Sequence, residues 1–349
     1  MRWIHSPAVD LGLFSFSWLG VYLLIVFWPL LHGQRPCEVY SLGTCSSVVI
    51  GMYAVSNYLF RLHRHYTFAI VYADRQEFLR HSRLYTWLPA GLVAVLLPVT
   101  FYKLFSGPLR GGLHLGLTVL SAVAGAWSLW HIVLQKYGLI RLYSAKLGHG
   151  DARAEFGMLI SWLCVSLTAL VKTFSSYFIP LVLVNAPIGI DALKLIVTLL
   201  SKLVWLALPF AAYYTGRFFR VERANFSRAS IPKLVFTGMT LTMLATIPYS
   251  LVNAYIAAGV NHSLEYIAFV NIYGPRKPGL TYWSARPIIS NALIIGFVGV
   301  LYWLMQLDPL MAVSIVVGYS TLISLTHFTF DSVLWKLREE SRREVLLSH

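Results

Sequence analysis

The stretch "PLMAVSIVVGYSTLISLTHFTFDSVLWKLR", Pro309 to Arg338, contains the two features on which the fold class and the candidate site depend. Residues 309–330 form an apolar run, and a helix needs about 20 such residues to cross a bilayer. His327 and Asp331 stand near its end, one helical turn apart and therefore on one helix face. Titratable side chains are costly within a membrane-spanning helix, so this pair indicates a function.

The whole chain has the composition of a membrane protein. Hydrophobic residues make up 57%, charged residues only 12%, and the mean hydropathy is +0.66. These values exclude an ordinary soluble domain and predict an all-α, polytopic integral membrane bundle. We expect one transmembrane domain over 1–349, with a short charged cytoplasmic tail at 337–349. The first apolar run, about 11–31, has no small-residue cleavage site after it, which predicts a retained helix rather than a signal peptide.

The apolar runs predict nine or ten crossings, and we favour ten. Runs of spanning length occur at about 11–32, 45–62, 84–105, 112–135, 155–175, 191–214, 233–257, 287–306 and 309–330. Residues 258–274 supply the tenth crossing, with a turn near Gly259 and Asn261. With only nine crossings, basic clusters that flank the last helices would fall on opposite sides of the membrane.

The basic residues predict the orientation. The net charge is +14, but the lysines and arginines sit in short loops between apolar runs. This is the positive-inside pattern, not the basic stripe of a nucleic-acid-binding protein. With ten crossings, most of these residues and both termini lie on the cytoplasmic side, as in a bacterial inner membrane or its equivalent. Cys37 and Cys45 flank a loop and could form a disulfide if that loop faces an oxidising compartment.

Counting back from basic interface residues places several polar groups at one depth. The second, fourth, eighth and tenth predicted helices run in the same direction. The polar groups on them lie roughly 14–21 Å from the next cytoplasmic basic residue at 1.5 Å per residue. These groups are His63, His131, His262 with Glu265, and His327. Four helices therefore offer polar side chains in one layer of the inner half of the membrane.

Further polar residues follow these groups at helical spacing. Thr67 and Asp74 share a face with His63, Gln135 lies one turn beyond His131, and Asp331 lies one turn beyond His327. His65 competes with His63 but points to another face. We expect His65, Thr67, Asp74, Gln135 and Asp331 to orient ligands through hydrogen bonds or to act as alternative ligands.

Imidazole and carboxylate groups suit a transition metal. The predicted ligands are His63, His131, His262, Glu265 and His327. A metal at this depth would act on a molecule that arrives through the bilayer, so we expect a lipophilic substrate, contacts with membrane lipids and, where needed, an electron-donor protein. Iron is the favoured metal, in an oxygenase, desaturase or hydroxylase.

Two families of histidine-dependent membrane oxygenases are similar at class level. "HFTFD", His327 to Asp331, resembles the H-x-x-x-D settings of bacterial membrane carotene dioxygenases, which spread single histidines over several helices. That resemblance implies dispersed ligands around iron. Membrane fatty-acid desaturases and hydroxylases instead use clustered boxes such as H-x-x-x-H, which this sequence lacks. Its nearest approach is "HRH", with His63 and His65.

Two other classes of function stay open from the sequence. A haem could be held axially by His131 with His327, or by His63 with His262. A layer of histidines and carboxylates could also form the proton or cation path of a transporter. Measurements of bound metal and of haem absorbance separate these hypotheses.

Overall fold

The structure is a computed structural model that describes residues 1–33, 46–185, 190–276, 280, 283, 285–305, 307 and 311–335. The described residues are helical, with short turns and no strand, which confirms the all-α prediction. The predicted disulfide of Cys37 and Cys45 and the predicted tail at 337–349 lie outside the described residues.

The chain forms two compact units. Unit 1 comprises Met1–Asn57 and Val133–His262, and unit 2 comprises Tyr58–Ile132 and Ser263–His349. The division falls inside three continuous helices, which are α3 (Ser47–Ala73), α6 (Gly107–Leu147) and α11 (Leu251–Tyr273).

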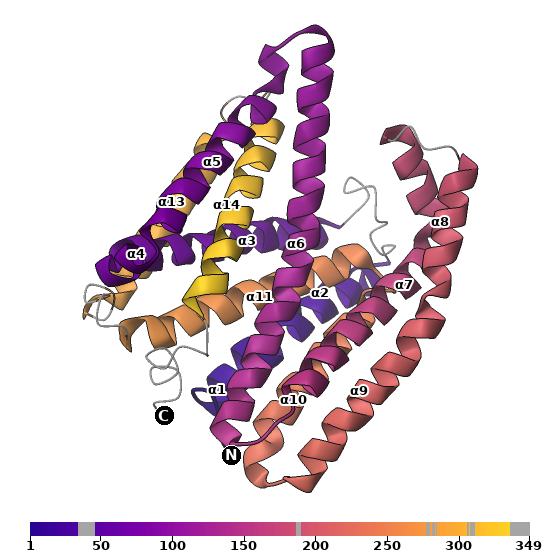
Figure 1. The fold of residues 1–349 in the computed structure, drawn as a ribbon, viewed down its shortest axis with the longest axis vertical. Helices are drawn as coiled ribbons and strands as arrows, with labels where there is room; N and C mark the ends of the chain where they lie inside the picture. The colour runs from indigo at the N-terminus through magenta and orange to yellow at the C-terminus, as the bar shows by residue number, and fades with distance from the viewer. Residues whose placement is uncertain are drawn as a thin grey trace. The chain divides into compact units, whose positions relative to one another are not determined.

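Unit 1 also contains the short α1 (Pro7–Val9), the π-helix η1 (Asp10–Ser15), α2 (Ser17–Leu31), α7 (Ala152–Asn185), α8 (Ile190–Lys202), α9 (Val204–Ala224) and α10 (Ile231–Thr246). Unit 2 also contains α4 (Arg75–Arg80), α5 (Ser82–Thr100), α13 (Pro287–Leu304) and α14 (Ala312–Leu334). Figure 1 labels these helices. Single 3₁₀ turns occur at Tyr102–Leu104, Arg228–Ser230 and Gly274–Arg276.

Among the described residues, six segments are long and apolar enough to cross a membrane. They are Ser82–Thr100, Gly107–Leu147, Ala152–Val171, Val197–Ala224, Pro287–Leu304 and Ala312–Leu334. A seventh is possible if Pro7–Ser15 and Ser17–Leu31, which meet at a 45° bend, form one span. The described helices support neither the predicted ten crossings nor the predicted common side for the two termini.

Two long helices are absent from those six for a chemical reason. The 27-residue α3 carries Arg61, His63, Arg64 and His65 in its second half, and the 23-residue α11 carries polar residues on each side of its centre. These side chains lower the mean hydropathy of each helix below that of a typical spanning segment. Two of the four helices that carry predicted site residues, α3 and α11, are therefore not among these six spans, whereas α6 and α14 are.

The predicted turn near Gly259 and Asn261 is wrong. Helix α11 is continuous from Leu251 to Tyr273, and the break lies earlier, between Thr246 and Leu251. Pro248 lies in that break, where it lacks an N–H and disfavours helical backbone in the residue before it. Gly259 costs roughly 1 kcal/mol relative to alanine within a helix, which does not suffice to end one.

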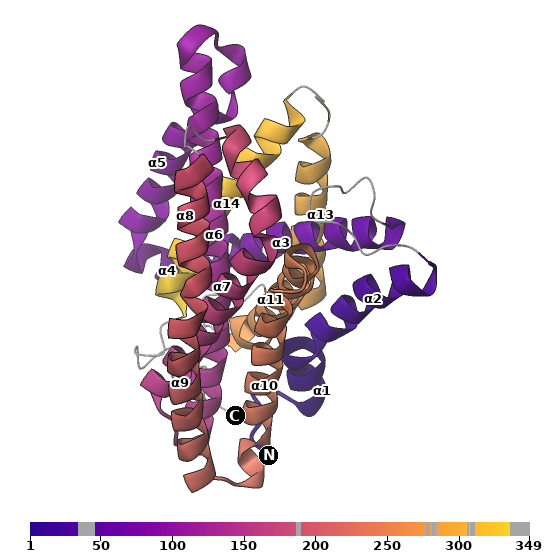
Figure 2. The same cartoon turned by 90° about the vertical axis from the view of Figure 1, so that its right-hand side faces the viewer.

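The packing of unit 1 centres on α7, which contacts α8, α9 and α10. Helices α7 and α9 lie side by side in both views (Figures 1 and 2). A Cβ added at Gly157 would come within 2.5 Å of the Tyr214 ring, so only glycine permits this approach. Ala154, Met158 and Phe218 form the buried apolar cluster beside it.

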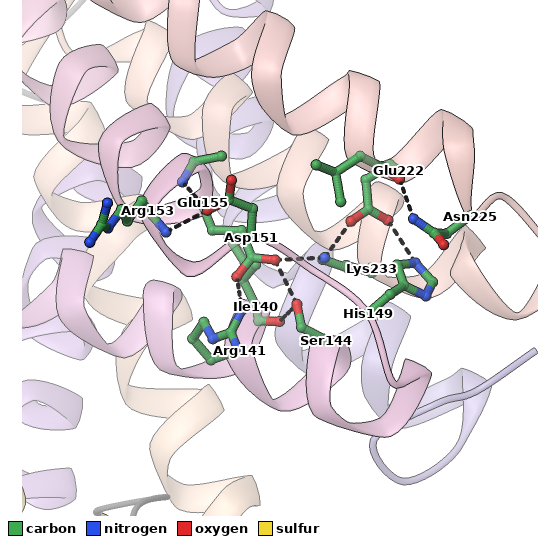
Figure 3. A network of polar contacts seen from close by, with 12 residues as sticks. Ile140, Arg141, Ser144, His149, Asp151, Arg153, Glu155, Glu222, Asn225 and Lys233 are labelled. Carbon is green, nitrogen blue, oxygen red and sulfur yellow. Dashed lines mark hydrogen bonds and ion pairs between the residues drawn. The ribbon is translucent and has the colours of Figure 1, made fainter.

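A buried ionic cluster joins α6, α7, α9 and α10 in unit 1 (Figure 3). The Lys233 ammonium is completely buried and donates to Glu155 Oε1 at 2.7 Å and to Glu222 Oε1 at 2.5 Å. Arg141 donates to the other Glu155 oxygen at 2.7 Å, and Ser144 donates to Glu155 Oε1 at 2.7 Å. Two cations thus balance two carboxylates, which is how a buried charge is tolerated.

Asp151 directly precedes α7 beside this cluster. Its carboxylate accepts bonds from the backbone N–H groups of Arg153 and Ala154 and from Arg217 Nε at 2.6 Å. Desolvation raises the pKa of Asp151, but the bonds from Ala154, Arg217 and Arg153 outweigh it and hold that pKa below its ordinary value. A carboxylate in this position caps the helix and complements its dipole.

The core of unit 2 forms where α3 meets its neighbours. Leu62, Tyr66 and Ile70 repeat at intervals of four and present one face of α3 to Tyr85 of α5 and Phe330 of α14. Helices α5 and α14 pack directly against each other. The residues next to this face, beginning at positions 63 and 67, belong to the candidate site.

We expect Lys233→Met to destabilise the protein strongly, because it leaves two buried carboxylates with one fewer cation. Breaking a buried ion pair from one side costs about 3–5 kcal/mol. Thermal unfolding of the detergent-solubilised protein, followed by the monodisperse fraction in size-exclusion chromatography, measures the effect. Arg223→Met, at an exposed position of the same unit, is the matched control. Equal melting temperatures for the two variants would contradict the prediction.

Candidate metal centre

Four helices of unit 2 bring polar side chains together in its interior. Helix α6 contributes His131, and α14 contributes His327 and Asp331. The unit 2 parts of α3 and α11 contribute Thr67 and Tyr266. All five residues are at most 9% exposed, so the site is closed to bulk solvent.

His131, His327 and Asp331 offer three ligand atoms in one small volume. The Nε2 atoms of His131 and His327 lie 3.7 and 3.6 Å from Oδ2 of Asp331. All three ligand atoms lie within 4.8 Å of one another. The two imidazole rings have centres 4.8 Å apart and meet at 70°. Two imidazoles and one carboxylate therefore converge on a common point.

The Thr67 hydroxyl organises two of these three ligands. Its Oγ1 lies 2.7 Å from His327 Nδ1, 3.0 Å from Asp331 Oδ1 and 2.5 Å from the Tyr266 hydroxyl. Tyr266 donates to Asp331 Oδ1 at 2.7 Å. The Thr67 and Tyr266 hydroxyls supply one hydrogen each, so by themselves they can form only two of these four contacts as hydrogen bonds. A third hydrogen bond requires that His327 Nδ1 carries a hydrogen and donates it to Thr67. In that tautomer, His327 Nε2 presents its lone pair towards Asp331 Oδ2.

The Asp331 carboxylate thus uses its two oxygens differently. Oδ1 accepts hydrogen bonds from hydroxyl groups, whereas Oδ2 lies 3.6 Å from His327 Nε2, which carries a lone pair in the tautomer that donates to Thr67. A carboxylate oxygen and an imidazole lone pair are both acceptors and repel each other. A cation between them converts that repulsion into coordination, which is the chemical basis for a candidate metal centre.

His63 lies beside the three ligands on α3. Its ring centre is 4.9 Å from that of His327, and its Nδ1 lies 3.2 Å from the Leu59 carbonyl oxygen and 3.1 Å from Ser263 Oγ. The bond to the carbonyl of the preceding turn fixes the orientation of the ring. The structure therefore brings the predicted ligands His63, His131 and His327 together in unit 2.

Other predicted residues have separate environments. His65 points to another face of α3, where its Nδ1 lies 2.7 Å from the Arg61 carbonyl oxygen and its Nε2 contacts the Tyr319 hydroxyl. Asp74 lies beyond the end of α3 and caps α4, accepting bonds from the N–H groups of Gln76 and Glu77 at 3.0 and 3.1 Å. The expectation that Asp74 continues the face of His63 is wrong, because α3 ends at Ala73.

His262, Gln135 and Glu265 are not part of the three-ligand group. His262 is buried in α11 as the last residue of unit 1, where its backbone carbonyl accepts a bond of 3.1 Å from Gln135 Nε2. Gln135 therefore bonds to a backbone carbonyl of α11. Glu265 is buried in the unit 2 part of α11.

Sequence reasoning missed Tyr266, Ser263 and Trp335. Tyr266 bonds to Asp331, Ser263 to His63, and Trp335 Nε1 donates to the Tyr266 hydroxyl at 3.3 Å. The spacing of Ser263 and Tyr266, three residues apart next to His262, is the only local signal. Serine and tyrosine are common in membrane helices, so that spacing alone does not distinguish a site.

Comparisons with protein-family models, with curated proteins and with solved structures find no match for the chain.

We expect Thr67→Val to destabilise unit 2, because valine keeps the volume but removes the hydroxyl that joins His327, Asp331 and Tyr266. Loss of a buried hydrogen-bonding partner costs about 1–3 kcal/mol. The control is Thr329→Val on α14, because the Thr329 hydroxyl bonds only within its helix, to the Leu325 carbonyl. Thermal unfolding should show a lower melting temperature for Thr67→Val, and a smaller effect than in the control would contradict this role.

Proposed function

We propose that the protein is a membrane metalloenzyme, an iron-dependent oxidoreductase that acts on a lipophilic substrate. One observation carries the proposal. The Nε2 atoms of His131 and His327 converge on the same oxygen of Asp331, at 3.7 and 3.6 Å, in a buried site. Two histidines and one carboxylate are the ligand set typical of non-haem Fe(II) oxygenases.

The spacing of the ligand atoms fits a single metal ion. With metal–ligand distances of about 2.0–2.1 Å, neighbouring ligand atoms lie about 2.8–3.0 Å apart in octahedral and about 3.3–3.4 Å apart in tetrahedral coordination. The separations of 3.6 and 3.7 Å exceed these spacings by less than about 1 Å, which side-chain rotations would close. His327 Nδ1, bonded to Thr67, gives the tautomer that a metal requires at Nε2.

The surroundings favour an oxidoreductase with an apolar substrate. A metal held by three protein groups would keep coordination positions open for oxygen and substrate, and it would supply the oxidation chemistry here. His131 and His327 lie on helices α6 and α14, both apolar enough to span a membrane. Their ligand atoms are enclosed, and Phe328 lies against the His131 ring with centres 4.6 Å apart. Such walls favour hydrocarbon over a polar substrate.

Residues around the ligands would hold the centre in shape. Thr67 and Tyr266 bind Asp331 Oδ1, so Oδ2 stays directed at the imidazoles. His63 packs against His327 with its ring at 81° and limits the rotation of that ligand. Ligand orientation of this kind typically contributes about 10- to 100-fold to metal affinity.

Axial haem ligation by His131 and His327 fits this geometry poorly. Two histidines on opposite sides of a haem iron would have ring centres at least about 6 Å apart, given iron–nitrogen distances of about 2 Å. The observed separation is 4.8 Å. This distance favours a shared metal ion over a haem between these two rings.

Metal analysis tests the centre. We expect close to one iron per chain in protein purified under oxygen-free conditions, and a loss of most of it in His131→Ala and in His327→Ala. His65→Ala is the matched control, because His65 contacts Arg61 and Tyr319 instead of the three ligands. Inductively coupled plasma mass spectrometry measures the content. Full metal content in both ligand variants would refute the assignment, as would wild-type protein without stoichiometric transition metal.

Isotope labelling tests the reaction class. Iron-loaded protein in vesicles of native lipid, given a chemical reductant and ¹⁸O₂, should yield lipophilic products that carry ¹⁸O or have lost two hydrogens. Mass spectrometry of the extracted lipids detects either change. Asp331→Asn should reduce product formation at least tenfold, because an amide oxygen is a weaker metal ligand than a carboxylate. Equal product from the wild type and from this variant would contradict the proposed reaction.

A further inference from the structure

Two arginines of unit 2 lie on α3 close to the candidate metal centre, and the centre does not use them. Arg61 and Arg64 are three residues apart, so they lie on one side of the helix with Cβ atoms about 5–6 Å apart. Both face α14. Charged groups in such surroundings are costly and indicate a function by default.

Arg61 is half-buried between α13 and α14. Its guanidinium carbon lies 4.5 Å from the centre of the Tyr302 ring, and its Nε donates to Ser320 Oγ at 3.2 Å. Its Nη1 atom is enclosed and has no hydrogen-bond partner among the residues that the structure describes. In the described part of the chain, no carboxylate forms an ion pair with Arg61. Within the described part of the chain, this buried guanidinium donor therefore lacks an acceptor.

Arg64 lies deeper, with 7% of its surface exposed. Its guanidinium carbon lies 5.5 Å from the centre of the Phe60 ring and 5.9 Å from that of Phe328. The Phe328 ring also lies 4.6 Å from the ring of His131. One aromatic ring therefore separates the Arg64 charge from a proposed metal ligand.

We propose that Arg61 and Arg64 bind the carboxylate of the substrate, which is an apolar chain that ends in a carboxylic acid. Both guanidinium groups are positively charged, so an oxyanion that contacts them would be attracted to each. Guanidinium groups present planar pairs of N–H donors that match a carboxylate. Tyr302, Phe60 and Phe328 supply walls for the first methylene groups of the chain.

This inference rests on the proposed function and names its substrate class. Phe328 contacts both Arg64 and His131, so a chain anchored at the arginines would pass this ring to reach the metal. The carboxylate would then set which carbon lies at the metal, because the anchor fixes the distance along the chain.

Binding of defined probes to the full-length protein in nanodiscs tests the proposal. The probes are octadecanoate with a ¹³C-labelled carboxyl group, octadecanol and octadecyl phosphate. Competition of each probe with a radiolabelled hydrocarbon-chain ligand gives its dissociation constant. We expect octadecanoate to bind the wild type at least tenfold more tightly than octadecanol. Arg61→Gln should remove this preference without weakening octadecanol, Arg61→Lys should restore part of it, and Arg110→Gln, at an exposed position of α6, should keep it.

Several results would overturn the proposal. Equal affinity of the wild type for octadecanoate and octadecanol would exclude an anion site, and this comparison needs no variant that might fail to fold. Tighter binding of octadecyl phosphate than of octadecanoate would overturn the carboxylate assignment. The measurements are made with metal-loaded and with chelator-treated protein. A preference for octadecanoate in metal-free wild-type protein supports the anion site even if the metal centre is refuted. If metal-loaded wild-type protein shows no such preference, the anion site is refuted and the metal centre is not.

Discussion

The arrangement of unit 2 depends on the solvation of one buried carboxylate. Asp331 is 9% exposed, and an ionised carboxylate in such surroundings costs several kcal/mol unless protein groups replace water. Thr67 of α3 and Tyr266 of α11 bond to one oxygen, and His131 of α6 faces the other. Three helices, α3, α6 and α11, must therefore approach α14 at one level. The same requirement explains why these helices carry polar residues where a simple membrane span would carry leucine.

Unit 1 meets the same requirement in a chemically different way. Glu155 and Glu222 are buried, but Lys233 lies between them and Arg141 contacts Glu155, so cations of the protein balance the carboxylates (Figure 3). Asp331 instead faces two imidazole nitrogens. The first arrangement is complete as it stands and stabilises the fold. The second presents several acceptor atoms to one point, which is why the metal proposal concerns unit 2.

The polar residues also explain where topology reasoning failed. Hydropathy identifies spans by the absence of polar side chains, whereas α3 and α11 contain arginine, histidine, asparagine and glutamate. Gly259 and Asn261 predicted a turn within residues 233–274, although Asn261 is buried and donates to the carbonyl oxygens of Leu13 and Phe14. An asparagine that bonds to another helix cannot be distinguished in sequence from one that ends its own.

The sequence by itself determined the helical membrane class, because hydropathy depends on residue type alone. It also determined the pairing of His327 with Asp331, because helical spacing sets that contact locally. It also identified His63 and His131 as candidates by their depth along the chain, and Thr67 by its helical spacing from His63. Only the tertiary structure decided which candidates meet. It joined Thr67 to His327 across 260 positions, added Tyr266, assigned Asp74 to a helix cap and directed Gln135 to a backbone carbonyl. The physical reason is that helical periodicity gives the relative directions of side chains on one helix, but not how that helix is rotated against its neighbours.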